Sequence, residues 1–522
     1  MKLIFLLPII FTPLLLTSQT SVHLQVGKAY KTNVSSSSNH RVVDPNTHNL
    51  IHAKKRRVEV LDAEKLTSKA VFISKEFPKQ FSTSGCYTFN GKLFMIYYTV
   101  NVKTITTTYW GVQISFDTGK TIGEHKKIIA FKEYLSGRPI IQFSDKTKKG
   151  LFVIRRSPKN SNDAKSHDII ETFIFDDNLN VLTASPITMP YTEQKMDNLG
   201  YFLGKDDKVY LFAKVRADGG SKNYKKQGKH FILKFHIEFI QFNLKNKSTK
   251  ITKLDFGDYN FEIFTPSFDD DGVIKLVGYY SESASDFIPP ANGIFVANFN
   301  IETGELKNKL YQIPLEILDL YEGNRERAKN KKEGAGLDAL YPIIVKWEDD
   351  NSLILVGEQL LKRTSSTTNS TGLTTVTTKI IEGDILVAKI NPDGELAYIN
   401  RIPQRGYAGS FSSCYIDKKD AIYYFSIDHH KNLNLKTDDV PEECINEKDL
   451  DFIMVKINKE TGDFEKKSIF KYGQKKGNYT LAPHRILNVS PISDEGVFIH
   501  TLEDTKNFVI NTLLMKALIK EE

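Results

Sequence analysis

Side chains that could bind a ligand gather in a few long polar segments, and none of these segments forms a recognised catalytic motif. Residues 218–229 (DGGSKNYKKQGK) are basic with one tyrosine, a composition that suits a carboxylate or a phosphate group. Residues 283–292 carry one phenylalanine beside two prolines, and residues 428–450 begin with an aspartate and two histidines. The candidate ligand-binding residues are therefore Arg216, Lys222, Tyr224, Lys225, Phe287, Asp428, His429 and His430.

The adjacent histidines His429 and His430 raise the question of a metal site. Zinc sites combine histidine, cysteine and carboxylate ligands at short characteristic spacings. Neither an i, i+4 histidine pair nor a Cys-x-x-Cys motif accompanies these histidines, so we predict no metal and interpret the segment as a solvated loop. No cofactor is predicted either.

The sequence contains no Gly-x-Ser-x-Gly, Walker or His-Glu-x-x-His motif. Carboxylates such as Glu358 could pair for glycoside hydrolysis, but the separation of two carboxylates cannot be read from sequence. The three cysteines form no disulfide framework. We interpret Cys86 and Cys414 as small buried thiols in strands, and a bridge from Cys414 to Cys444 stays open as an alternative.

One short motif resembles a known structural signature. Residues 115–121 read SFDTGKT and are followed by Ile122. This stretch resembles the Asp-box of sialidases and related propellers, Ser-x-Asp-x-Gly-x-Thr-Trp, with isoleucine in place of tryptophan. The resemblance implies a turn between the third and fourth strands of a blade, in which Asp117 and Thr121 bond the turn backbone and Gly119 takes a positive φ. The box residues are Ser115, Asp117, Gly119 and Thr121.

The elements that position these residues form a repeat. A hairpin of an apolar strand, a tight polar turn and an alternating strand occurs at 293–314, 383–403 and 451–472. From residue 81 onward, seven short turns join a first to a second strand, and six join a third to a fourth. The first set comprises 90–91, 145–150, 205–208, 269–272, 349–352, 417–420 and 493–496, and the second comprises 117–120, 176–180, 245–248, 302–305, 391–395 and 459–463.

Such a repeat predicts an all-β fold, a seven-bladed β-propeller. Residues 58–76 precede the first blade, and we predict that they supply the outer strand of the last blade and so close the ring. A tandem β-sandwich or a β-helix is the alternative fold. The segment 315–336 is the best candidate for a helix, on the rim or as a lid.

The amino terminus indicates export. Residues 1–19 combine one lysine with a short apolar run and small polar residues, which predicts a secretory signal peptide, with a membrane anchor as the alternative. Residues 20–55 are rich in Ser, Asn, His and Thr and are expected to form a flexible lead-in. Residues 56–522 would form the propeller. We expect the protein to be secreted, periplasmic or at the cell surface, with no membrane span.

The longest predicted loops join second to third strands, and these loops lie on one face of a propeller together with the crossovers between blades. Long loops on one face of a rigid scaffold commonly carry binding or catalysis. The net charge of +8 is spread along the chain, and no nucleic-acid recognition motif accompanies it, so nucleic-acid binding is not expected.

Three segments of the chain resemble uncharacterised secreted propeller-like proteins of Bacteroidetes-type bacteria. These are 357–363 (GEQLLKR), 383–403 (GDILVAKINPDGELAYINRIP) and 421–432 (AIYYFSIDHHKN), in that order. The resemblance implies secretion and a propeller-like fold, and no known activity. The lead hypothesis is a monomeric binding module for a glycan or a cell-surface protein rather than an enzyme. The alternative is a carbohydrate-active enzyme, a sialidase-like glycoside hydrolase or a lyase.

Overall fold

The computed structural model describes most of the chain after the predicted signal peptide, which lies outside the described residues. The described residues are 20–31, 40–44, 50–54, 57–62, 64–73, 75–78, 80–132, 139–144, 147–156, 165–204, 207–217, 224–227, 230–257, 259–268, 272–282, 289–323, 325, 327, 336–368, 374–406, 414–444, 446–502 and 511–521.

The fold is all-β, as predicted, and is built of consecutive antiparallel sheets whose strands follow chain order. The first sheet contains β3 (His40–Val43), β4 (Leu50–Lys54), β5 (Arg57–Asp62) and β6 (Thr67–Ile73). The second contains β7 (Ser82–Phe89), β8 (Lys92–Asn101), β9 (Thr106–Ile114) and β10 (Thr121–Phe131). The third contains β11 (Ile140–Ser144), β12 (Lys149–Arg156), β13 (His167–Asp176) and β14 (Val181–Thr192). The fourth contains β15 (Met196–Leu203), β16 (Lys208–Arg216), β19 (Phe235–Asn243) and β20 (Ser248–Leu254).

The second half of the chain continues the pattern. The fifth sheet contains β21 (Asn260–Phe268), β22 (Val273–Ser281), β23 (Gly293–Asn300) and β24 (Leu306–Gln312). The sixth contains β25 (Leu340–Trp347), β26 (Leu353–Thr368), β27 (Thr374–Ile390) and β28 (Leu396–Ile402). The seventh contains β29 (Cys414–Asp417), β30 (Ala421–His429), β31 (Leu450–Asn458) and β32 (Phe464–Lys471). The last contains β35 (Ile486–Ser493), β36 (Gly496–Leu502) and β37 (Asn511–Glu521).

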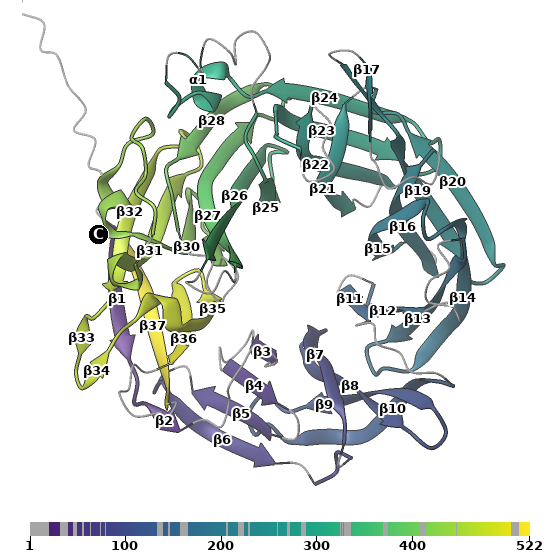
Figure 1. The fold of residues 1–522 in the computed structure, drawn as a ribbon. Helices are drawn as coiled ribbons and strands as arrows, with labels where there is room; N and C mark the ends of the chain where they lie inside the picture. The colour runs from purple at the N-terminus through teal and green to yellow at the C-terminus, as the bar shows by residue number, and fades with distance from the viewer. Residues whose placement is uncertain are drawn as a thin grey trace, which may run out of the picture.

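The amino-terminal strand β1 (Thr20–Val26) completes the last sheet. It runs antiparallel to β37 from the pair Thr20↔Glu521 to the pair Val26↔Met515, and the short β2 (Tyr30–Lys31) also pairs with β37. Figure 1 shows the eight sheets disposed around a common centre, with first strands such as β7, β15 and β25 toward it and fourth strands such as β14 and β20 at the periphery. The two ends of the described chain therefore meet in one sheet.

Three expectations about the fold and the amino-terminal region need correction. The described residues hold eight sheets of this kind rather than seven, because residues 40–73 form a sheet of their own. Residues 58–76 do not complete the last sheet, since β1 does so. The range 20–55, expected to be a flexible lead-in, contains β1 to β4. These strands are short and polar, so their alternation is hard to detect against the serine-rich and asparagine-rich composition around them.

The turns between third and fourth strands share one local device. A side-chain oxygen at the end of the third strand accepts two backbone N–H bonds from residues of the turn, which satisfies donors that the hairpin leaves unpaired. At Asn300 the bonds come from Glu302 and Thr303, at 3.0 and 2.9 Å. The same arrangement is made by Asp62, Ser115, Asp176, Asn243 and Asn458.

The core lies between neighbouring sheets, whose faces pack on one another. Phe239 of the fourth sheet contacts Phe299 of the fifth edge to face, with ring centroids 5.0 Å apart. Tyr109 of the second sheet contacts Phe152 of the third in the same way, at 5.2 Å. Burying rings of this size removes a large apolar area from water, so each sheet depends on its neighbours for stability.

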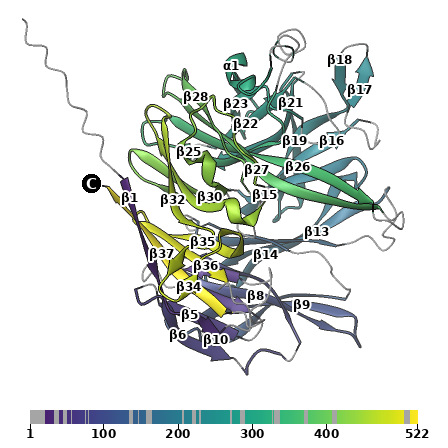
Figure 2. The ribbon, with the colours of Figure 1, turned by 60° about the vertical axis from the view of Figure 1, so that its left-hand side comes forward.

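Long connections between second and third strands occur in the fourth and seventh sheets, as predicted, whereas only residues 102–105 join β8 to β9 in the second sheet. A small hairpin of β17 (Tyr224–Gln227) and β18 (His230–Leu233) is inserted between β16 and β19. In the sixth sheet, β26 and β27 pair with each other from Leu360↔Glu382 to Thr368↔Thr374, beyond the reach of β25 and β28. Figure 2 shows this two-stranded arm projecting past the neighbouring sheets.

Helix is scarce in the described residues. The predicted helix at 315–336 begins with α1 (Leu315–Leu318), in the crossover between β24 and β25. No helix in the described part of the chain is long and apolar enough to cross a membrane.

Candidate functional site: a buried polar network under the loops

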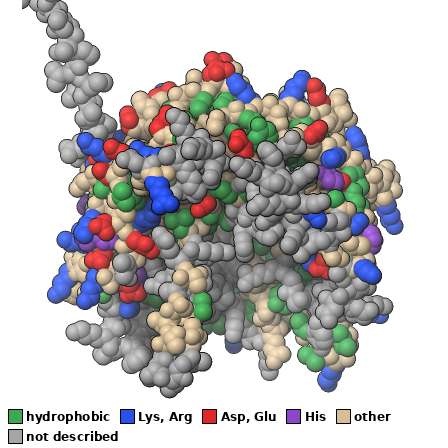
Figure 3. All heavy atoms as spheres, turned by 45° about the horizontal axis from the view of Figure 1, so that its top comes forward, with side chains coloured by type: hydrophobic (Ala, Val, Ile, Leu, Met, Phe, Trp, Pro, Cys, Tyr) green, Lys and Arg blue, Asp and Glu red, His purple; other side chains and the backbone are tan. Residues whose placement is uncertain are grey.

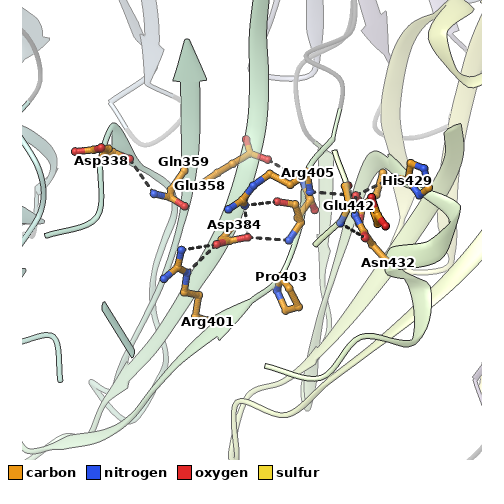
Figure 4. Close-up of polar contacts among 12 residues, drawn as sticks. Asp338, Glu358, Gln359, Asp384, Arg401, Pro403, Arg405, His429, Asn432 and Glu442 are labelled. Atoms are coloured by element: carbon orange, nitrogen blue, oxygen red, sulfur yellow. Dashed lines mark hydrogen bonds and ion pairs between the residues drawn. The ribbon is translucent and has the colours of Figure 1, made fainter. Parts of the chain in front are cut away.

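The most distinctive polar feature of the described chain is a set of charged side chains buried at the loop-side ends of the sixth and seventh sheets. We call it the buried polar network. Figure 4 labels five of its members, which come from β26, β27, β28, the crossover after β28 and the loop after β30: Glu358, Asp384, Arg401, Arg405 and Asn432. The network consists of Glu358, Glu382, Asp384, Arg401, Gln404, Arg405, Asp428, Asn432 and Lys466.

Asp384 is the first anchor of the network and is 1% exposed. Its Oδ2 accepts bonds from Nε and Nη2 of Arg401, at 2.7 and 2.6 Å, and its Oδ1 pairs with Arg405. Oδ1 also accepts the backbone N–H of Gln404 at 2.9 Å. Two guanidinium groups and one amide thus surround the carboxylate, which is the compensation that a buried charge requires.

Arg401 connects this anchor to the crossover that contains α1. Its Nη1 donates to the backbone carbonyls of Ile317 and Leu318, at 3.1 and 3.5 Å. The guanidinium carbon lies 4.4 Å from the centre of the Tyr321 ring, a cation–π contact. Arg401 therefore holds the 315–321 segment against the outer strand of the sixth sheet.

Asp428 is the second anchor, at the end of β30. Its Oδ1 accepts the backbone N–H of Arg405 and His429 and the side-chain amide of Asn432, at 3.1, 2.8 and 2.8 Å. Its Oδ2 lies 3.0 Å from Nζ of Lys466, which also donates to the Pro403 and Asn432 carbonyls. The aspartate thereby joins a strand of the seventh sheet to the crossover that leaves the sixth.

Asn432 extends the second anchor into the loop between β30 and β31. Its side-chain oxygen accepts the backbone N–H of Glu442 at 2.8 Å, and its amide donates to the Glu442 carbonyl at 3.0 Å. These two hydrogen bonds between Asn432 and Glu442 therefore hold together two distant parts of the loop, which runs from residue 430 to residue 449.

Glu358 occupies the inner part of the network, on β26. Its Oε1 accepts the hydroxyl of Tyr424 at 2.6 Å and the side-chain amide of Gln404 at 3.4 Å. The Gln404 side-chain oxygen in turn accepts the Ser426 hydroxyl at 3.1 Å. The Glu358 carboxyl group thus receives one hydrogen bond from β30 and one from the crossover after β28.

Glu382 differs from the other carboxylates of the network. Burial, followed by the negative charges of Glu358 and Asp428, raises the pKa of Glu382 well above 4.5. The network contains four carboxyl groups and the three cations Arg401, Arg405 and Lys466. A proton on one carboxyl group, such as Glu382, would therefore make the network as a whole neutral. Gly406 covers this carboxyl closely, since a Cβ there would lie 3.3 Å from Glu382 Oε2 and 2.2 Å from the Ile427 carbonyl.

A second polar cluster lies beside the network, at the start of the loop after β30. His429, His430 and Asp449 each offer a ligand atom, and these atoms lie within 4.8 Å of one another. The two imidazole rings stack with centroids 4.6 Å apart. Burial, followed by the neighbouring His430, lowers the pKa of His429, which is neutral at pH 7. We call these three residues the histidine cluster.

The structure separates the residues that the sequence analysis selected. Arg216 ends β16 and pairs with Asp197 on β15, so its charge is used within the fourth sheet. Tyr224 and Lys225 lie in β17, where their side chains are outside the described set, as are Lys222 and Phe287 altogether. Only Asp428, His429 and His430 come together, and Asp428 is buried as a structural anchor.

Sequence reasoning missed most of the network and Asp449. Asp384, Arg401 and Asp428 lie within the segments that carry the resemblance to secreted propeller-like proteins. A charged residue inside an otherwise apolar strand, such as Asp384 in GDILVAKI, was the available signal, because such a residue needs a buried partner. Asp449 follows His430 by 19 residues, and no spacing rule connects them.

The Asp-box turn is formed differently from the expectation. Gly119 has a φ of 68°, as predicted. The turn backbone is bonded by Ser115, whose hydroxyl accepts the N–H groups of Asp117 and Thr118. Asp117 instead pairs with Lys69 at 3.3 Å, and the Thr121 hydroxyl bonds Glu76, so these two side chains link the second sheet to residues 69–76.

The three cysteines are free thiols, and no bridge joins Cys414 to Cys444. Burial raises the pKa of Cys86 and of Cys414 to about 12, which removes thiolate character at neutral pH. Cys414 is buried, as interpreted from the sequence, whereas Cys86 is half-buried.

The described surface carries mixed charge in one view of the molecule. Figure 3 shows lysine and arginine side chains interspersed with acidic ones over the described part of this view, without a large area of one sign. This distribution gives no support to nucleic-acid binding, which depends on a continuous basic surface.

Similarity to known proteins is slight. No family model matches the sequence, and no curated protein matches it significantly. In structure the chain is similar to the polysaccharide lyase Uly1, with 9% identity, a TM-score of 0.38 and coverage of 83% of this chain and 89% of the lyase. It is also similar to a point mutant of the apocarotenoid oxygenase of Synechocystis, with 7% identity, a TM-score of 0.32 and coverage of 68% of each chain. Likenesses this low support no inference about activity.

Proposed function

We propose that this protein is a secreted eight-bladed β-propeller whose loop-bearing face binds a glycan or a protein surface. Seven four-stranded antiparallel sheets and an eighth sheet, in which β1 and β2 pair with β37, support the propeller and its closure. The apolar leader at residues 1–19 supports export.

The observation that carries the binding function is the use of buried charge to hold loops. The network fixes the 315–321 crossover through Arg401, the 403–406 crossover through Asp384 and Asp428, and the loop after β30 through Asn432. Burying ions is costly, and an apolar core would close a sheet as well. Rigid positioning of several loops on one face is what a recognition surface requires.

The test is an array of glycans and a panel of cell-surface proteins, probed with the full chain. The exposed residues Lys431 and Val440 lie on the loop after β30, and K431E with V440D changes that surface without touching a buried group. K307E, on an exposed lysine of β24 near the opposite turns, is the matched control. Binding that is weakened by the loop variant and retained by the control supports the proposal. Binding that neither variant changes places recognition elsewhere and contradicts it.

A carbohydrate-active enzyme is the second candidate, and one observation favours it. Glu358 accepts hydrogen bonds from Tyr424 and Gln404, while burial raises the pKa of Glu382. A pair of carboxyl groups, one of them with a raised pKa, is the arrangement that glycoside hydrolysis uses as base or nucleophile and acid. Both side chains are less than a tenth exposed, so a substrate reaches them only if the cover at Gly406 moves.

Turnover of a panel of chromogenic glycosides and of polysaccharides separates the two candidates. Activity that falls by at least about a hundredfold in E382Q and in E358Q, with folding retained, would establish the enzyme, because general acid–base groups contribute on that order. A glycan that binds without being turned over supports the binding module.

A further inference from the structure

We propose that His429, His430 and Asp449 bind a divalent transition-metal ion of the zinc class. Their ligand atoms lie within 4.8 Å of one another, so one ion can contact all three after small side-chain adjustments. The proposal does not depend on the binding or enzymatic function of the face.

His430 is already held in the form that a metal needs. Its Nδ1 lies 3.1 Å from the backbone carbonyl oxygen of Asp449. A carbonyl only accepts, so Nδ1 carries the proton and Nε2 presents a lone pair. Metal-bound histidines commonly donate their second ring nitrogen to a carbonyl or carboxylate in this way, which fixes the ring and the tautomer.

The other two ligands are held by their backbones. The His429 amide donates to the buried Asp428 carboxylate at 2.8 Å, and the Asp449 amide donates to the Asn446 carbonyl at 3.1 Å. The stacked rings, inclined by 24°, show that both imidazoles lie on one side of the chain although the residues are adjacent. The end of β30 turns into a short 3-10 helix (His430–Asn434), which removes the alternation that a strand would impose.

His429 must give up one hydrogen bond to bind the ion. Its Nδ1 accepts the backbone N–H of Lys431 at 3.1 Å. If the metal binds Nδ1, it displaces the Lys431 N–H from that nitrogen. If the metal binds Nε2, the ring proton is on Nδ1, which then cannot accept the Lys431 N–H. Metal binding therefore exposes the Lys431 amide in either case, and this supplies a readout independent of affinity.

The donor set selects the class of ion. Two imidazoles and one carboxylate suit Zn²⁺, Ni²⁺ or Co²⁺, whereas Ca²⁺ and Mg²⁺ prefer sites built of oxygen ligands. Three protein ligands leave at least one position for water, which distinguishes this site from a closed structural zinc site.

The experiment is calorimetric titration of the untagged, chelator-treated full chain with ZnCl₂, NiCl₂ and MgCl₂. We expect one site for zinc and nickel, no competition by magnesium, and a loss of affinity of at least about tenfold in H430A and in D449N. H236A, on a half-exposed histidine of β19 paired with Glu238, is the control and should bind as the wild type does. His430 is exposed and Asp449 is half-buried, and circular dichroism checks that both variants fold.

Hydrogen exchange with and without zinc is the second arm. Faster exchange at the Lys431 amide in the wild type, absent in H430A, supports ligation at this cluster. Zinc binding that is equally tight in the wild type and in the H430A/D449N double variant overturns the proposal, as does the absence of binding in the wild type.

Discussion

The ammonium group of Lys466 lies 3.0 Å from the Asp428 carboxylate, and both side chains are excluded from solvent. The pair joins the outer strand of the seventh sheet to the end of β30 and, through the backbone amide of Arg405, to the crossover from the sixth sheet. This contact is the physical basis of the proposal that two sheets and their loops form one rigid face.

Lys466→Met should strongly destabilise the protein. Removing one partner of a buried ion pair leaves the other charge without compensation, which costs roughly 3–5 kcal/mol. The measurement is the midpoint of urea unfolding. The exposed pair Lys307–Glu305 provides the control, and Lys307→Met should leave the midpoint unchanged because surface ion pairs contribute little. Equal midpoints for both variants would show that the Lys466 pair is not a structural anchor.

Glu382→Gln should change how stability depends on pH. The folded pKa of Glu382 is raised above 4.5, so between 4.5 and that folded pKa the native state binds more protons than the unfolded state. The contribution of Glu382 to stability is therefore fully present below about pH 4.5 and falls as pH rises through the folded pKa. Glutamine removes this dependence, because it resembles the protonated acid.

The measurement is the melting temperature of wild type and E382Q between pH 4.5 and pH 8. We expect E382Q to gain stability relative to the wild type as pH rises. Parallel curves for the two proteins would mean that Glu382 titrates as an ordinary carboxylate.

Leu24→Asp should disrupt the closing strand. Leu24 is 7% exposed and packs in the core cluster of the last two sheets, whereas its neighbour His23 is exposed. Loss of a buried leucine costs roughly 2–5 kcal/mol before the penalty for the charge is added. His23→Asp on the same strand should have little effect, so thermal unfolding of the two variants separates burial from charge. A protein that tolerates both would not be closed by β1.

Asp62→Ala should weaken the first sheet by about 1 kcal/mol, since Asp62 Oδ1 accepts the backbone N–H groups of Glu64 and Lys65 at 2.9 Å each. Asp62→Asn keeps the acceptor oxygen and should restore most of the stability. Urea unfolding of both variants tests whether the turn of the first sheet is built as in the later sheets. Equal stability of the alanine and asparagine variants would argue against it.

The later sheets were predictable from sequence because their strands are apolar and their turns carry Asn, Asp and Gly. The first sheet was not, because β3 and β4 have only four and five residues in a polar region. One feature of the sequence could have predicted a turn there. Asp62 ends an apolar strand, as Asn300 and Asn458 do, and all three side chains accept backbone N–H groups of the turn that follows. The strand β1 could not be assigned, because its partner β37 lies at the other end of the chain.

The candidate site was predictable only in part. Asp428, His429 and His430 were selected from the long loop predicted after the second strand of the seventh sheet. The pairing of Asp384 with Arg401 and the approach of Asp449 to His430 arise from pairing between strands and from the course of a loop. Contacts of this kind depend on tertiary structure, and no local pattern in the sequence specifies them.

The most direct test of this account is hydrogen exchange of the purified full chain, because the proposed propeller requires that strands from both ends of the chain share one sheet. If β1 completes the last sheet, the amides of Thr20–Val26 that face β37 exchange slowly and at rates similar to those of β37 itself. Exchange of the whole Thr20–Val26 segment within seconds, while β36 and β37 remain protected, would contradict the account.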